Sequence, residues 1–142
     1  MDNIEKEFMY GGRKCVITFT EFGYWCGYAE IRPNEKLYNK NFVEINDERV
    51  LPFRISYAGT TFPIKDGTFW IGFTCDDKGE KPDSARVKEI WGDQAFVMIY
   101  LNMQKVSPFP KNGILRDINY VENKLKRLVN GVDVYENGRQ NT

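Results

Sequence analysis

The sequence predicts an α+β domain, a mostly antiparallel β-sheet with a C-terminal helix packed on one face. Short apolar and aromatic runs, separated by glycine and proline, fill the first half of the chain and are typical of strands. A stripe of apolar residues with helical spacing lies near the C-terminus. A length of 142 residues suits one domain, expected at residues 1–135, with a flexible tail at 136–142.

The first third of the chain predicts a hairpin and a further strand. Residues 8–10 and 14–20 flank Gly11 and Gly12, a two-residue glycine turn of the kind that closes a β-hairpin. Residues 24–31 form a second aromatic run and predict the next strand. Successive side chains of this run would point to opposite faces, so both faces of the sheet are expected to be partly covered.

The middle of the chain predicts a long connection and two strands. Residues 34–52 are polar and mixed, and we expect an ordered loop pinned to the body by a few apolar side chains. Residues 53–57 alternate apolar and polar, as a half-exposed strand does. Residues 68–75 form the most apolar run and predict a central strand, in which Gly72 permits a close backbone approach.

The second half of the chain predicts a second helix, in the segment between Glu80 and Ile114 that we call the insertion. Residues 81–91 begin with Pro82, and either Asp83 or Ser84 could cap a helix there. The apolar run at 95–101 fits a continued helical stripe and a separate strand equally well. The insertion is therefore expected to be a helix, or a helix followed by a strand.

The C-terminal helix has the clearest pattern. Its apolar positions recur with the spacing of one helix face at Val121, Leu125, Leu128 and Val129. Asn119 and Glu122 have the spacing of a capping box, and Asp117 is an alternative cap. Gly131 is placed where a glycine often ends a helix.

The composition favours a binding protein over an enzyme. Basic and acidic residues number 20 each, so the net charge is zero and a dedicated nucleic-acid-binding protein is not expected. The chain has no histidine, which excludes Ser-His-Asp and Cys-His catalysis and histidine-ligated zinc. Any chemistry would need carboxylates, lysine, tyrosine, cysteine or a metal held by oxygen ligands.

The cysteines and the termini indicate a cytoplasmic protein. Cys15, Cys26 and Cys75 form no CxxC pair and lie in apolar surroundings, so we expect small buried side chains in a reducing compartment. No apolar run reaches the roughly 18 residues needed to cross a bilayer. The polar, acidic N-terminus is unlike a secretory signal.

Three carboxylates follow the predicted central strand at Asp76, Asp77 and Glu80. Oxygen ligands this close together could hold Mg²⁺, and a carboxylate-bound Mg²⁺ that activates water would make a metal-dependent hydrolase or phosphodiesterase. The simpler interpretation is a charged turn in which Lys78 offsets the repulsion of the acids. That interpretation requires no cofactor.

A second set of residues could bind a nucleotide-like ligand. Arginine and lysine would hold its phosphates and aromatic rings would face its base. The candidate binding residues are Arg54, Tyr57, Lys65, Trp70, Trp91 and Arg116. The simpler alternative pairs Arg116 with a nearby surface carboxylate. A third candidate is the aromatic cluster at 22–28, since exposed tyrosine and tryptophan often anchor protein interfaces.

Four short motifs of the chain occur in the same order in one known family. They are GYAEIRP at 27–33, ISYAG at 55–59, FWIGFTC at 69–75 and RDINYVE at 116–122. Together they resemble a family of small, largely uncharacterised proteins encoded by bacteriophages and prophages. The family pattern carries histidines where this chain has Glu35, Arg54 and Asp77, so a histidine-dependent activity would not carry over.

The resemblance implies a setting and a role. Small, neutral phage proteins outside the capsid are often accessory factors that bind a host protein or a host signal molecule. The resemblance thus implies a protein of the host cytoplasm that inhibits a host function, such as antiviral defence, by binding a host protein or sequestering a nucleotide-like signal. Such proteins are often oligomeric, so a homo-oligomer is compatible with this role.

Overall fold

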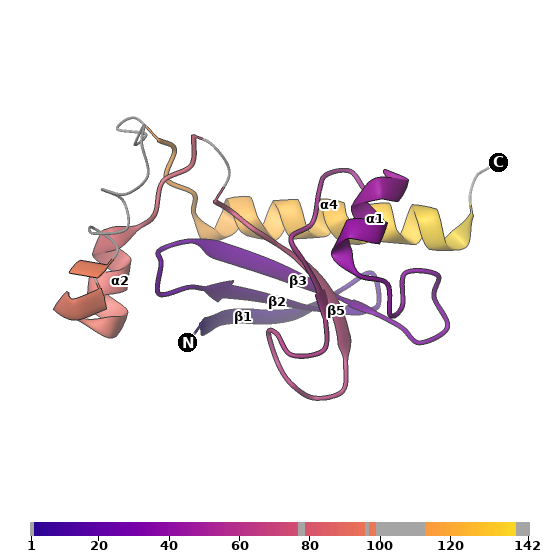
Figure 1. The fold of residues 1–142 in the computed structure, drawn as a ribbon, viewed down its shortest axis with the longest axis horizontal. Coiled ribbons are helices and arrows are strands. Elements are labelled where there is room, and N and C mark those ends of the chain that lie inside the picture. The colour runs from indigo at the N-terminus through magenta and orange to yellow at the C-terminus, as the bar shows by residue number, and fades with distance from the viewer. Residues whose placement is uncertain (1, 77–78, 96, 99–112, 139–142) are drawn as a thin grey trace.

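The fold is α+β, as the sequence predicts, with a five-stranded sheet in the order β1-β2-β3-β5-β4 (Figure 1). A computed structural model describes residues 2–76, 79–95, 97–98 and 113–138. Every neighbouring pair of strands is antiparallel. The strands are β1 (Asn3–Tyr10), β2 (Arg13–Phe19), β3 (Trp25–Ile31), β4 (Tyr57–Gly59) and β5 (Phe69–Thr74). The helices are α1 (Phe42–Glu48), α2 (Ser84–Trp91) and α4 (Ile118–Asn137).

The predicted hairpin is confirmed. Gly11 and Gly12 both have positive φ angles, 60° and 76°, which match the twist of a two-residue hairpin turn and which other residues rarely adopt. Strand β1 begins at Asn3, well before the predicted start at residue 8. It is the outermost of the described strands on its side of the sheet, so it can carry polar side chains that the sequence pattern does not mark as a strand.

The prediction of a loop over residues 34–52 is wrong in its centre, because α1 forms there. Asn41 caps this helix by accepting a hydrogen bond from the backbone N–H of Glu44 at 2.9 Å, and the Glu44 side chain reaches back to the Asn41 N–H. Ile45 is buried and anchors the helix to the body. The sequence signal for this helix consists of the capping box followed by a single buried apolar residue, and it is hard to recognise in a segment of mixed composition.

The predicted strand at 53–57 is also wrong, since β4 begins only at Tyr57. The Asn46 side chain forms hydrogen bonds with both the N–H and the carbonyl group of Ile55. Its amide donates to the Ile55 carbonyl oxygen and its carbonyl oxygen accepts from the Ile55 N–H, both at 2.8 Å. These bonds replace the ladder that a strand would need, so the chain stays irregular until Tyr57.

The predicted central strand is confirmed as β5, which pairs with β3 on one side and β4 on the other. A Cβ atom at Gly72 would lie 2.7 Å from the carbonyl oxygen of Gly27. The glycine therefore permits the close backbone approach that the sequence predicts.

Helix α4 covers one face of the sheet, and its N-terminal cap is Asp117 rather than Asn119. The Asp117 carboxylate accepts a hydrogen bond from the N–H of Tyr120 at 2.9 Å. The prediction that Gly131 ends the helix is wrong, because α4 continues to Asn137 and Gly138 caps it with a φ of 63°. Gly131 is a packing residue, since a Cβ atom there would overlap with Cδ of Pro52.

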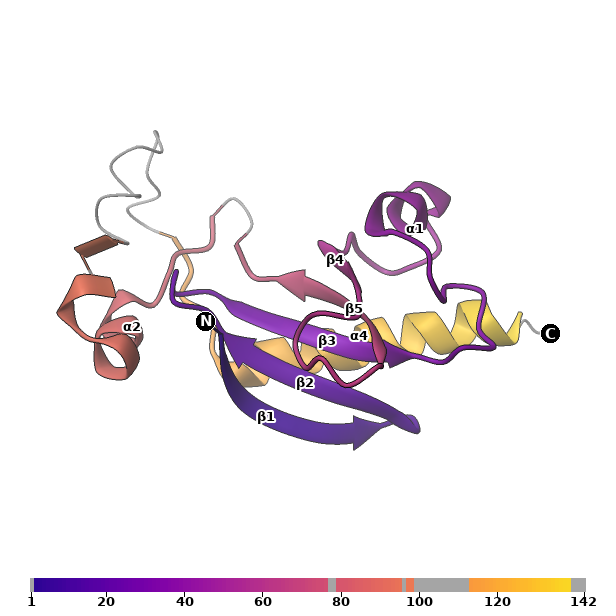
Figure 2. The ribbon, with the colours of Figure 1, turned by 60° about the horizontal axis from the view of Figure 1, so that its bottom comes forward.

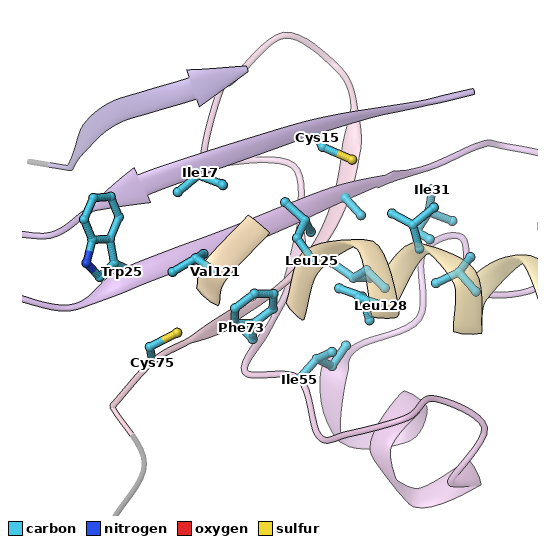
Figure 3. Packing of buried hydrophobic residues seen from close by; sticks show 14 of the residues in the cluster. Cys15, Ile17, Trp25, Ile31, Ile55, Phe73, Cys75, Val121, Leu125 and Leu128 are labelled. Carbon is cyan, nitrogen blue, oxygen red and sulfur yellow. The ribbon is translucent and has the colours of Figure 1, made fainter. Parts of the chain in front are cut away.

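The main core lies between α4 and the sheet (Figure 3). Leu125 and Leu128 reach from the helix toward Ile17 and Phe73 of the strands, and all four are fully buried. This contact is the apolar stripe that the helical spacing predicts. The opposite face carries a smaller cluster of Val16, Cys26, Tyr28 and Trp70, covered partly by the β4–β5 connection (Figure 2).

Helix α2 is confirmed at the predicted place, with Asp83 as its cap and Val87 as its buried residue. Of the ambiguous run at 95–101, residues 95, 97 and 98 are helical and the rest lies outside the described residues. Glu136, expected in the flexible tail, belongs to α4, where its carboxylate accepts from the N–H groups of Lys36 and Leu37 at 2.7 and 3.0 Å. No helix in the described ranges is long and apolar enough to span a bilayer.

Candidate anion-binding groove

Residues 50–53, between α1 and β4, form a ridge beside the C-terminal half of α4. Pro52 of this ridge packs against Gly131 of α4. Just beyond the ridge, Asn46 holds the backbone of Ile55. Tyr135 of α4 also donates its hydroxyl to Glu48 of α1 at 3.0 Å. Since contacts of this kind fix both ends of the segment, the ridge has a defined position on the molecule.

Residues of the ridge line two hollows, which share Leu51. The first has a volume of about 300 Å³ and is lined by Ile45, Asn46, Arg49, Leu51, Phe53 and Arg54. The second has a volume of about 440 Å³ and is lined by Val50, Leu51, Pro52, Arg127, Asn130, Gly131 and Val134. Neither described lining contains a carboxylate. We call the surface formed by residues 50–53 and the linings of the two hollows the arginine groove.

Three exposed arginines surround the ridge: Arg49 and Arg54 in the first hollow and Arg127 in the second. Within the described part of the chain, no carboxylate lies at ion-pair distance from any of these guanidinium groups. Arg49 also ends α1, with a left-handed φ of 55°. An unpaired guanidinium keeps its fork of N–H donors available for a carboxylate or a phosphate.

The ring of Phe53 lies under two cations. The Nζ of Lys124 is 4.7 Å from the ring centroid and the guanidinium carbon of Arg127 is 5.5 Å from it. Phe73 meets the same ring in a T-shaped contact at 5.4 Å. These contacts hold Arg127 at the edge of the groove, and they also cover the aromatic surface of Phe53.

The acids of the neighbouring helix α1 are partly engaged elsewhere. Glu48 accepts hydrogen bonds from Lys40 at 2.7 Å and from Tyr135, and these bonds, that of Lys40 first, lower the pKa of Glu48. Glu44 takes part in the capping box of α1. Asp47 is exposed on the same helix.

The structure does not bring the predicted binding residues together. Arg54 lines the arginine groove, whereas Arg116 donates to Glu80 at 2.7 Å and lies 3.9 Å over the ring of Tyr120. Trp91 stacks on Phe19 at 6.1 Å. Helix α2 and the start of α4 lie at one end of the molecule and α1 at the other (Figures 1 and 2), so Arg116 and Trp91 are remote from Arg54.

The other three predicted residues lie on or near the second face of the sheet. Trp70 is only 1% exposed, and its indole N–H donates to the Ile64 carbonyl oxygen at 3.3 Å. The Tyr57 hydroxyl accepts from two backbone N–H groups of the β4–β5 connection at 3.0 Å each. Lys65 is exposed on that connection. Tyr57 and Trp70 thus belong to one packed cluster, and in the 22–28 cluster Trp25 and Tyr28 are buried as well.

The two carboxylates after β5 that the structure describes, those of Asp76 and Glu80, differ in their exposure. Glu80 is 7% exposed, and its carboxylate accepts from the guanidinium of Arg116. Asp76 is exposed, and Asp77 lies outside the described residues. In the ranges that the structure describes, no group of three or more cysteine, aspartate or glutamate side chains is arranged to hold a metal ion. Glu80 serves an ion pair at the base of the insertion, and the Mg²⁺ site stays a prediction.

Sequence reasoning found Arg54 and missed Arg49 and Arg127. A local signal exists, because the segment 49–54 places an arginine on each side of an apolar run. Arg127 gives no comparable signal, since it is one of several basic residues in α4. Only the packing of Pro52 on Gly131 shows that this helix face and the ridge form one surface.

The chain matched no protein-family model, no curated protein and no solved structure in comparisons with known proteins.

Proposed function

We propose that this chain is a binding protein without catalytic activity that holds an anionic partner in the arginine groove. The observation that carries the proposal is the cluster of Arg49, Arg54 and Arg127, which are exposed and have no carboxylate partner among the described residues. On a chain of zero net charge, such a concentration of unpaired guanidinium groups favours a local anion.

The lining of the groove supports binding rather than turnover. General acid–base catalysis needs a titratable side chain within hydrogen-bond reach of the substrate. The described linings offer arginine, asparagine, glycine, proline and aliphatic or aromatic side chains, and none of these is a general base at neutral pH. Such a surface can hold a partner and has no described group to transform it.

The motifs that resemble the phage and prophage family support a setting for this binding. In that setting the protein acts in the host cytoplasm, and by occupying an anionic partner it inhibits a host function such as antiviral defence. The partner is a host protein or a nucleotide-like signal molecule.

Titration calorimetry with two probes, polyglutamate and ATP, tests anion binding at the groove. We expect at least one probe to bind, and Arg54→Gln or Arg127→Gln to weaken it by about tenfold or more, because each removes charge-assisted hydrogen bonds worth about 1.5–3 kcal/mol. Lys126→Gln is the matched control, since Lys126 precedes Arg127 on α4 but pairs with Glu122 on another side of the helix. Equal binding by all variants, or by none of them, would refute the proposal.

Recovery of the probe separates capture from conversion. After incubation with ATP, the protein is denatured and the nucleotide is analysed by chromatography. Intact ATP is expected. New products that disappear in Arg54→Gln would place a reaction at the groove and contradict a purely binding role.

A further inference from the structure

We propose that the anionic partner is an acidic protein segment with aliphatic side chains, and that this segment lies across the ridge with carboxylates on Arg54 and Arg127. This inference rests on the proposed function, since it names the class of partner for the same groove. Three features of the described residues support it: the covered aromatic ring, the open shape of the two hollows and the exposed aliphatic surface.

The groove offers no aromatic platform for a nucleobase. Phe53 is the only ring in the described lining of either hollow, and it is half-buried and already in contact with Lys124, Arg127 and Phe73. Nucleotide-binding proteins commonly stack the base on an aromatic side chain, which a base could do here only by displacing these contacts. A carboxylate needs no such platform.

The shape of the groove fits a chain better than a small molecule. Sites for small ligands are enclosed and bury most of the surface of the ligand. Here residues of one ridge line both hollows, which share Leu51 among their described lining residues and open to solvent. An extended or helical segment can cross the ridge and contact both hollows at once, with acidic side chains reaching Arg54 in the first hollow and Arg127 in the second.

Exposed apolar side chains near the arginines indicate that the partner carries aliphatic side chains as well as carboxylates. Val134 lines the second hollow and is 65% exposed. Val43, on helix α1, is 54% exposed. Aliphatic side chains of a partner would bury this surface, while its carboxylates would neutralise the arginines. Interfaces of this kind combine an apolar centre with charged groups that fix orientation.

The ridge is already ordered without a partner, which limits the loss of conformational entropy on binding. Pro52 is seated on Gly131, and Asn46 holds the backbone of Ile55 at 2.8 Å on both sides. Such preorganisation raises affinity for a segment that must itself become ordered. The same ordering means that a substitution of Arg54 or Arg127 removes charge from the surface and leaves the ridge in place.

A displayed library of random peptides tests the class of partner directly. Selection on the wild-type protein is expected to enrich peptides that combine aspartate or glutamate with leucine, isoleucine or valine. Selection on Arg54→Glu/Arg127→Glu is expected to lose this enrichment, and selection on Lys126→Glu to retain it. The best selected peptide should bind the wild type at least about tenfold more tightly than it binds either single charge reversal.

ATP, a cyclic dinucleotide and the selected peptide are then compared by competition for the groove. Arginine-dependent binding of a nucleotide that is tighter than that of any selected peptide would overturn this inference while leaving the proposed function intact. Peptides without acidic enrichment would also overturn it. If no peptide and no nucleotide depends on the arginines, the inference and the proposed function fail together.

A second copy of the chain is another possible occupant, because Glu44 and Asp47 lie exposed on α1 beside the groove. Sedimentation of the free protein tests for it. A monomer that binds the selected peptide supports the proposal. A dimer that Arg127→Glu dissociates and that Asp47→Arg restores would assign the groove to self-association and overturn the inference.

Discussion

Among the described residues, Arg13 is the most deeply buried charge on the main-core side of the sheet, and it shows how single residues set the stability of this fold. It is 1% exposed, and its guanidinium donates to the carboxylates of Glu35 at 2.6 Å and Asp133 at 3.0 Å. A third bond reaches the Glu30 carbonyl oxygen at 3.0 Å. Because these partners come from β3, the segment after it and α4, one side chain joins three parts of the chain.

Glu35→Gln should lower the free energy of unfolding by about 3 kcal/mol, since a buried cation that loses a carboxylate keeps the cost of its desolvation. Urea denaturation followed by tryptophan fluorescence measures the change. Glu89→Gln, at an exposed position of α2, is the control and should leave the midpoint unchanged. Equal midpoints for the two variants would show that Arg13 is held without Glu35.

The same carboxylate makes the fold sensitive to acid. Burial by itself raises the pKa of Glu35, but the hydrogen bonds from Arg13 and from the backbone of Arg32 outweigh it and bring the pKa below its ordinary 4.5. A group of this kind stabilises the fold fully above its unfolded-state pKa, and the contribution is lost as the pH falls through the folded-state pKa. Below about pH 4.5, Glu35→Gln should therefore lose less stability than the wild type. Parallel losses in both proteins would assign the acid sensitivity to other groups.

At the scale of elements, apolar runs predict the strands well and local rules predict their connections poorly. β2, β3 and β5 each have neighbours on both sides and fill both faces, so apolar and aromatic residues predominate in their sequences. The alternation at 53–57 looks like another strand, but the distant Asn46 takes its hydrogen bonds. A pattern within five residues cannot contain that information.

The groove was harder to predict than the sheet for the same reason. The ridge and α4 are far apart in the chain, and Gly131 looks like a helix stop until Pro52 is found against it. The sequence makes Arg54 a candidate because it lies in the predicted strand at 53–57, from which it could meet Arg116 across the sheet. Its partners in the groove come from tertiary packing, which periodicity does not encode.

Gly131→Ala tests the contact between α4 and the ridge. In an exposed helix the change would stabilise by about 1 kcal/mol, but here the new methyl group overlaps Pro52 and should destabilise the protein by about 1–3 kcal/mol. It should also shift the ridge and weaken binding of the selected peptide. Asn123→Ala, exposed on the same helix, is the control and should be neutral or slightly stabilising. A more stable Gly131→Ala protein would show that the ridge moves to accommodate the methyl group at little cost in free energy.

At the scale of the whole molecule, both faces of the sheet are covered and all three cysteines lie inside. Cys15, Cys26 and Cys75 are 1%, 3% and 2% exposed. Burial raises the pKa of Cys15 to about 11 and that of Cys75 to about 12. Burial also raises the pKa of Cys26. The thiols are therefore protonated at neutral pH and out of reach of reagents.

Thiol reactivity should report unfolding of the molecule as a unit. With Ellman's reagent at pH 8, we expect negligible reaction of the native protein and release of three equivalents after denaturation in urea. At intermediate urea the three thiols should react at one common rate. Rapid reaction of a single thiol in native buffer would reveal local opening of the element that carries it.

Strand β1 has a final consequence for how the molecule behaves at high concentration. Its pairing with β2 is irregular between Ile4 and Lys6, and Glu5, Lys6 and Glu7 place alternating charges along the rim. A straight, uncharged rim would be a template on which further chains could stack into fibrils. The irregular pairing and the charges disfavour such stacking, so deleting the extra residue while neutralising the rim should promote fibril growth at high protein concentration.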